Sequence, residues 1–233
     1  MGIDIALTRF FDECARSAGG MSGPMLGLGS LTLRETPEAL ADYAADHGYP
    51  RLARDPSVAA LFADRYAVDR YVSCDINGQA DIFLDLARPL PDDQRGAYLS
   101  VLNGGTLEHL FDLRLGMQNI HDAAAVGGLM IHTCPLTWFE HGFVNINPMM
   151  LHLTAEANDY ETVAEGYYFC AGTWDGQDRP AVSIVGADDL APDGATPLAD
   201  LFRGRALPAH VMHLIALRKQ RDRPFVAPVH VST

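Results

Sequence analysis

Residues 97–109 read Ala-Tyr-Leu-Ser-Val-Leu-Asn-Gly-Gly-Thr-Leu-Glu-His, and this stretch decides the expected fold. Its first part, 97–103, is apolar and strand-like, and it ends in the polar residue Asn103. After the glycine pair, apolar residues at spacings of three and four predict a helix over 107–124. A strand that leads through glycines into a helix is the building unit of an α/β protein.

The same alternation of strands and helices extends to both sides of this unit. Further strands are expected at 24–28, 68–75, 80–86, 129–134, 160–172 and 211–219. Further helices are expected at 3–18, 37–48, 56–66 and 148–158. Strands that are apolar on both faces are typical of a parallel sheet covered on both sides. We therefore predict a doubly wound α/β fold, with a mostly parallel seven-stranded sheet and helices on both faces.

The length and the absence of a linker predict one domain over 1–233, with an N-terminal helix within 1–20. Residues 173–207 are rich in Gly, Asp and Pro, which predicts a loop-rich insertion. A loop of this length is often functional. This segment is either a lid over the site or a contact in a homodimer.

Composition excludes several classes of partner. The net charge of −13 disfavours nucleic acid and anionic membrane surfaces. No apolar run reaches the length of a membrane span, and the N-terminal residues lack the pattern of a signal peptide. The four cysteines show no paired spacing, so we expect reduced thiols in a cytoplasmic protein and no zinc bound by them.

In doubly wound sheets, ligands bind at the carboxyl ends of the strands. The expected strand ends carry glycines and polar residues in a set order: Gly27 with Gly29, then Asp75, Asp85, and Asn103 with Gly104. Glycines allow the backbone to approach a ligand, and a carboxylate at the second strand end can bind the hydroxyls of a ribose. The ordered set therefore predicts a nucleotide-like ligand at this edge.

Several segments resemble motifs of the class I S-adenosylmethionine-dependent methyltransferases, in particular a bacterial subgroup. The similar segments are Leu26–Ser30, Asp81–Leu86 with Arg88–Pro91, Asn103–His109, Gly127–Thr133, His141–Phe143 with Pro148, and Arg218–Phe225. The resemblance covers about residues 24–230. It implies S-adenosyl-L-methionine as the cofactor and a small molecule as the substrate. It also implies O- or N-methylation in secondary metabolism or saccharide biosynthesis.

The resemblance implies a role for each motif residue. Gly27, Leu28 and Gly29 would contact the methionine part of the cofactor. Asp75 would bind the ribose and Ile76 the adenine, while Asp85 and Leu86 would bind the adenine amine. Asn103 and Gly104 would line the sulfonium side, and His109 has either a structural or a cofactor-side role. Relatives that bind a metal here carry an earlier acidic residue; Gly105 holds that position, so we expect no metal.

The loop after residue 135 is the expected substrate side. His141 is the candidate general base, because a histidine can accept a proton near neutral pH; its alternative role is to stabilise the loop. Phe139, Asn145 and Asn147 are candidate substrate contacts, although Asn145 and Asn147 could instead cap the helix that follows. Tyr168 could face the pocket or pack in the core.

The sequence also predicts the environments of three further histidines. His132 lies inside a strand and is expected to be a hydrogen-bonded core residue, whereas His121 and His152 are expected on the solvent side of helices. Two alternatives to methyl transfer stay open. One is intramolecular cyclisation of S-adenosylmethionine, which releases methylthioadenosine, and the other is a binding module without catalysis.

Overall fold

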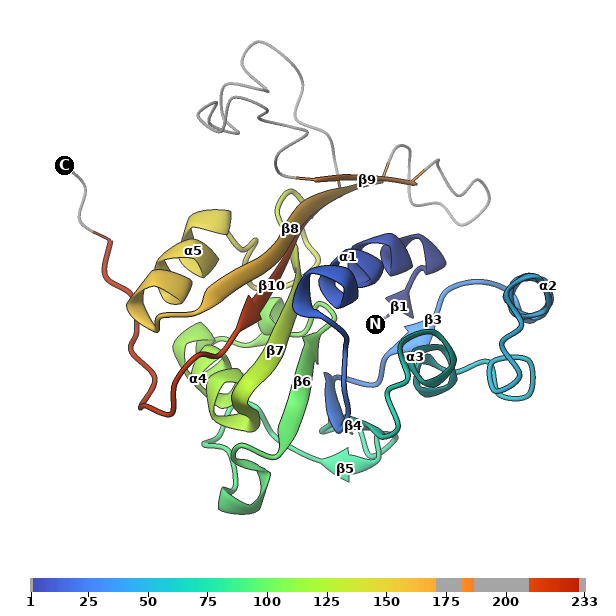
Figure 1. The fold of residues 1–233 in the computed structure, drawn as a ribbon. Coiled ribbons are helices and arrows are strands. Elements are labelled where there is room, and N and C mark those ends of the chain that lie inside the picture. The colour runs from blue at the N-terminus through green and yellow to red at the C-terminus, as the bar shows by residue number, and fades with distance from the viewer. Residues whose placement is uncertain (1, 171–181, 187–209, 231–233) are drawn as a thin grey trace, which may run out of the picture.

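The computed structural model describes residues 2–170, 182–186 and 210–230, and its centre is one eight-stranded sheet (Figure 1). In spatial order the strands are β5 (Ile82–Phe83), β4 (Tyr71–Asp75), β2 (Met25–Leu28), β6 (Tyr98–Asn103), β7 (Ala124–Pro135), β10 (Val211–Arg218), β8 (Glu161–Cys170) and β9 (Val182–Gly186). The five strands from β5 to β7 run parallel. β10 is antiparallel to both of its neighbours, so β8 points the same way as β7.

The prediction of a doubly wound, mostly parallel sheet is confirmed by this order. The chain begins in the middle of the sheet at β2, builds outward to β5, and then returns to build the other half from β6. β9 adds an antiparallel edge strand beside β8, within the segment 173–207 that the sequence predicts as loops. The rest of that segment lies outside the described residues.

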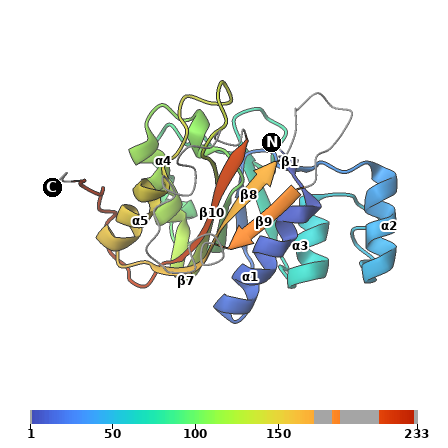
Figure 2. The ribbon, with the colours of Figure 1, turned by 90° about the horizontal axis from the view of Figure 1, so that it is seen from above.

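Helices cover both faces of the sheet, as Figure 2 shows from above. They are α1 (Thr8–Ala18) and α3 (Val58–Tyr66) on one face, α4 (Leu113–Ala123) and α5 (Pro148–Ala157) on the other, and α2 (Pro37–His47) outside α3. Two separate apolar cores follow from this layering. Phe11 and Phe62 pack under one face, and Ile120 and Leu151 pack under the other.

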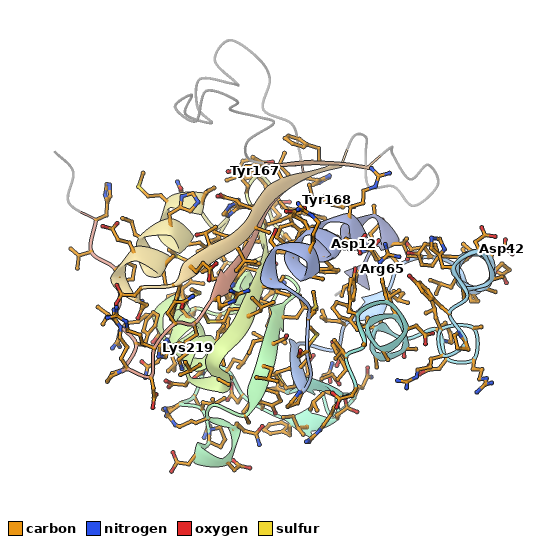
Figure 3. The ribbon with its side chains drawn as sticks, in the orientation of Figure 1. Asp12, Asp42, Arg65, Tyr167, Tyr168 and Lys219 are labelled. Atoms are coloured by element: carbon orange, nitrogen blue, oxygen red, sulfur yellow. The ribbon has the colours of Figure 1, made fainter. Side chains whose placement is uncertain are left out.

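An ion pair links the first two helices of the α1 face. Arg65 on α3 donates to both carboxylate oxygens of Asp12 on α1, with N–O distances of 2.8 and 2.6 Å (Figure 3). Two parallel bonds from one guanidinium fix the relative orientation of the two helices more firmly than a single contact does. The pair therefore helps to hold α1 over the strands that carry the site.

The N-terminal segment 1–20 is not one helix. Gly2–Ile3 form a short strand, β1, which pairs in parallel with β3 (Thr32–Leu33). A 3₁₀ turn, Ile5–Leu7, follows, and its first free N–H, that of Ala6, is capped by Asp4. Only then does α1 begin, and Gly19 ends it in a left-handed conformation.

The predicted helix over 107–124 is also divided. Leu107–His109 form a 3₁₀ turn, and α4 starts only after Asp112, whose carboxylate accepts a bond from the Leu115 amide at 3.0 Å. Asp is a favoured N-cap because it satisfies a free backbone N–H of the first turn. This capping signal overrides the continuous apolar spacing, and it leaves 107–109 free to face the sheet edge. A further 3₁₀ turn, Asp92–Gln94, precedes β6.

Among the residues that the structure describes, no helix is both long and apolar enough to cross a membrane.

Candidate active site

A cleft of about 270 Å³ opens at the carboxyl edge of β2 and β4. Its lining combines glycine backbone, one carboxylate and several apolar side chains: Gly29, Ser30, Cys74, Asp75, Ile76, Leu84, Leu86, Thr106 and His109. This is the edge at which ligands bind in doubly wound sheets. The structure thus brings five of the predicted cofactor residues together, namely Gly29, Asp75, Ile76, Leu86 and His109.

Asp75 is the last residue of β4 and lines the cleft. Its Oδ2 accepts bonds from the Ser30 amide at 2.9 Å and from Asn77 Nδ2 at 3.0 Å. Its Oδ1 accepts from the amides of Ile76 at 2.7 Å and Asn77 at 3.2 Å. Burial raises the pKa of this carboxyl, but the donated bonds outweigh burial and the net pKa is lowered. A carboxylate offers about four acceptor positions, and four donors already bond to Asp75. Asp75 can therefore bind a ligand hydroxyl only if a donor group of Asn77 moves away.

The predicted glycine motif divides into two roles. Gly29 lines the cleft with a φ of 85°, which favours glycine, and its amide is bonded to the end of β4. Gly27 lies inside β2, where an added Cβ would meet the Tyr71 hydroxyl at 2.0 Å. Its small size is therefore required for packing on the α1 face. The Leu28 side chain is buried in the opposite core, and its carbonyl accepts a bond from Thr106.

The predicted adenine side is only partly assembled. Leu86 is buried and Ile76 is exposed, and both line the cleft. The Asp85 carboxylate instead accepts bonds from the Ala87 amide at 3.0 Å and from Arg88 at 3.1 Å. It closes its own turn, and it is not among the described residues that line the cleft. These two bonds leave acceptor capacity on the Asp85 carboxylate, but the side chain is engaged in its own turn.

Asn103, at the end of β6, is fully buried and serves the turn that follows it. Its Oδ1 accepts bonds from the amides of Thr106 at 2.9 Å and Leu107 at 3.1 Å, and its Nδ2 donates to Cys134 Sγ at 3.5 Å. The side chain therefore shapes the 103–107 turn and does not line the cleft among the described residues. Gly104 lies beside it and faces a second, smaller cavity.

Directly beside the cleft, Glu108 and two histidines form a cluster. His141 Nε2 lies 3.5 Å from Glu108 Oε1, and the rings of His109 and His141 meet at 5.0 Å. Gly142 allows this approach, because an added Cβ would come within 2.7 Å of the Glu108 carbonyl. Trp138 packs against the other side of the His141 ring at 4.9 Å.

Burial shifts the pKa values of the glutamate and of one histidine in this cluster. The Glu108 side chain is fully buried, and neither carboxylate oxygen has a hydrogen-bond partner in the described part of the chain. Burial raises the pKa of Glu108 to about 7. Burial, with the nearby His109 and Arg34, lowers the pKa of His141. Near neutral pH the imidazole of His141 is therefore uncharged and able to accept a proton.

The second cavity lies on the α1 side of the same edge. Its lining includes Arg34, Gly104, Thr133, Trp138, His141 and Tyr168. His141 therefore lines this cavity, and its ring contacts the ring of His109, which lines the cleft. Tyr168 is buried in the core and also reaches the cavity, while Tyr167 points to the other face of β8 (Figure 3).

The other predicted substrate residues mainly shape the loop. Asn145 Oδ1 accepts a bond from the Trp138 amide at 3.0 Å, which closes the loop on itself. Asn147 caps α5 by accepting a bond from the Met149 amide at 2.9 Å. Of the two roles left open for Asn147, the structure shows capping. Phe139 is 76 % exposed and is not among the described residues that line the cleft or the second cavity.

The sequence did not predict that Glu108 is a partner of His141. The signal was present, since Glu108 lies next to His109 in the motif, but the contact with a residue in a distant loop is tertiary. Glu108, His109 and His141 each present a donor atom within 4.8 Å of the others, so the three could hold a cation. The absence of a metal, which the sequence predicts from Gly105, stays a prediction.

The comparisons with known proteins concern the fold. The sequence matches no protein-family model and no curated protein. A methyltransferase from Archaeoglobus fulgidus aligns over 91 % of each chain at 12 % identity and a TM-score of 0.47. The trans-methyltransferase CalH in complex with SAH aligns over 88 % of this chain and 53 % of its own, at 14 % identity and a TM-score of 0.36.

A 16S rRNA (adenine(1408)-N(1))-methyltransferase from Catenulisporales acidiphilia aligns over 91 % of this chain and 92 % of its own, at 12 % identity and a TM-score of 0.35. These scores are low, so the assignment of the fold depends on this chain's own strand order. A doubly wound sheet in which β10 runs antiparallel between β7 and β8 is the Rossmann-like fold that the sequence resemblance implies.

Proposed function

We propose that this protein is an S-adenosylmethionine-dependent methyltransferase that acts on a hydroxyl or amine of a small molecule. The observation that carries the proposal is the position of the cluster Glu108–His109–His141. His109 lines the cleft at the carboxyl edge, and His141 lines the neighbouring cavity, with 5.0 Å between their rings. A cofactor site and a proton acceptor are thus adjacent. A biosynthetic role in the cytoplasm, expected from the sequence, is part of this proposal.

The cleft fits the proposed cofactor in its chemistry. Ile76, Leu84 and Leu86 supply apolar surface on which a planar base can pack, and the open backbone at Gly29 allows close approach. Asp75 would bind the ribose hydroxyls after the Asn77 side chain moves away. When bound, S-adenosylmethionine supplies an electrophilic methyl group for an in-line displacement.

The residues of this chain would supply position and proton acceptance. His141 Nε2 accepts the proton of an acceptor hydroxyl or amine held in the cavity beside it, and becomes an imidazolium. Ionised Glu108, 3.5 Å away, stabilises that positive charge. Trp138, stacked on the ring, restricts its orientation.

Calorimetric titration of S-adenosylmethionine into the purified chain tests the cofactor. We expect Asp75→Ala to weaken binding by about 10- to 100-fold, because the variant loses a charged acceptor and the bonds that shape the cleft. Asp46→Ala, a change on the exposed surface of α2, is the matched control and should bind as the native chain does. Absence of binding by the native chain would contradict the proposal and favour a non-catalytic module.

Product analysis tests the reaction. Methyl transfer to an acceptor releases S-adenosylhomocysteine, whereas intramolecular cyclisation releases methylthioadenosine without any acceptor. We expect S-adenosylhomocysteine, released only when a competent acceptor from a panel of hydroxyl and amine compounds is present. Release of methylthioadenosine from the cofactor without an acceptor would contradict methyl transfer and support cyclisation.

A further inference from the structure

A second group of histidine and glutamate side chains lies outside the proposed active site, on the α5 face of the sheet. Glu165 on β8 lies between His152 on α5 and His213 on β10. The Nε2 atoms of both histidines are 2.7 Å from the same oxygen, Glu165 Oε1. One atom from each residue lies within 4.8 Å of the other two.

The strand register explains how the group forms. In the β8–β10 ladder Tyr167 pairs with His213, and Glu165 pairs with Ile215. Because side chains alternate along a strand, Glu165 and His213 share the face that α5 covers. His152, in the second turn of α5, reaches down to this face from above.

Two features of the group go beyond an ordinary hydrogen-bonded pair. The His213 side chain is fully buried, and its Nδ1 has no partner in the described residues. In addition, the Nε2 atoms of both histidines bond to the same carboxylate oxygen, at 2.7 Å each. The three side chains thus gather one possible ligand atom each, all within 4.8 Å of one another.

The residue types of the group suit a cation as well, because imidazole nitrogens and carboxylate oxygens are both ligands that zinc accepts. Two neutral imidazoles with one carboxylate form a common zinc ligand set.

We propose that His152, Glu165 and His213 bind one Zn²⁺ ion. Ligand distances of about 2.0–2.1 Å require only that the donor atoms separate slightly around the ion. The fourth ligand is water, because the His152 side chain is 47 % exposed and leaves that side of the site open. The ion would join α5 to β8 and β10, and so fix the half of the sheet that follows the proposed catalytic loop.

Zinc titration into the chelator-treated full chain, followed by calorimetry, tests the proposal. We expect one Zn²⁺ per chain, and about 100-fold weaker binding in His152→Ala and in Glu165→Gln. His152 is half exposed, so His152→Ala should fold even if Glu165→Gln does not. His47→Ala, which removes an exposed histidine of α2, is the matched control and should bind zinc normally.

A parallel titration of His141→Ala separates the two candidate cation sites. Unchanged zinc binding in this variant, together with its loss in His152→Ala, supports the proposal. Loss in His141→Ala with normal binding in His152→Ala would place the ion at Glu108, and it would overturn the proposal, as would a native chain that binds no zinc. Thermal melting gives a second readout, because zinc should raise the Tm of the native chain but not of His152→Ala.

Discussion

The two clusters of this protein contain the same residue types, one glutamate and two histidines, yet the pKa values of the two glutamates are shifted in opposite directions. Glu108 is buried without a hydrogen-bond donor in the described residues, and its pKa rises to about 7. Glu165 accepts bonds from two imidazoles, and its pKa falls to about 2. The surroundings of a carboxylate, more than its neighbours' identities, decide whether it serves proton transfer or holds positive charge.

The position of the histidines accounts for this difference. His141 and His109 come from a loop and a 3₁₀ turn, and the nearest of them stays 3.5 Å from Glu108. His152 and His213 come from a helix and a strand, which hold both nitrogens at bonding distance. Regular elements thus favour a closed, charged cluster, while the loop leaves room for a proton to move.

The largest expected effect concerns the base. His141→Gln should lower kcat by about 10²- to 10⁴-fold, because general-base catalysis contributes about that much. Binding of S-adenosylmethionine, measured by calorimetry, should stay within a few-fold of native. His47→Gln is the control for loss of a histidine. Native turnover by His141→Gln on the true acceptor would remove His141 from the mechanism.

Glu165→Gln should lower the free energy of unfolding by up to about 3 kcal/mol at pH 7, measured by urea denaturation in chelator. The folded pKa of Glu165 lies below its unfolded value, so this stabilisation is complete above pH about 4.5 and is lost toward pH 2. The difference between native and variant should shrink over that interval. If the difference in unfolding free energy between the two chains did not change with pH, the bonds from His152 and His213 would not lower the pKa of Glu165.

Glu108→Gln should change the free energy of unfolding in the opposite direction and stabilise the protein near neutral pH. The folded pKa of Glu108 lies above its unfolded value, so the native chain loses stability as pH rises from about 4.5 to 7, while the glutamine variant does not. We expect the variant to equal the native chain near pH 4 and to exceed it by up to about 3 kcal/mol at pH 8. Equal stability at both pH values would contradict the prediction, because it would mean that folding does not shift the pKa of Glu108.

The smallest effect is expected from chelation. Because the Glu108 cluster carries a carboxyl with a raised pKa and has Gly105 where an acidic residue would complete a site, methyl transfer should need no metal. Treatment with a chelator should lower the Tm through the His152 cluster and leave the initial rate at 25 °C unchanged. A rate that falls with chelator and returns with added cation would contradict the predicted absence of a metal.

The pattern of the chain predicts much of the fold. Apolar strands, capped helices and glycine turns are local features, so the doubly wound sheet and the cleft residues Gly29, Asp75 and Ile76 follow from the sequence. Local signals also set the limits of this prediction. Asp112 starts a new helix inside the expected one, and Asn103 turns its amide to its own backbone.

Histidine environments could not be predicted, because they depend on which elements meet. His121, expected at the surface, is buried between Tyr160 and the Arg223 carbonyl. His132, expected to be hydrogen-bonded, is buried with both ring nitrogens unpaired among the described residues, and burial lowers its pKa to about 3. His152, expected on the solvent side of its helix, is indeed half exposed, but it contacts Glu165.

Sequence alone therefore determined the layered sheet and the sheet edge at which the cleft lies, since both follow from short-range periodicity and turn chemistry. Tertiary structure alone decided the two clusters. Glu165 is 13 residues from His152 and 48 from His213, and no spacing rule joins positions so far apart. Only the packing of α5 over β8 and β10, and of the 136–147 loop over Glu108, brings these charges together and sets their pKa values.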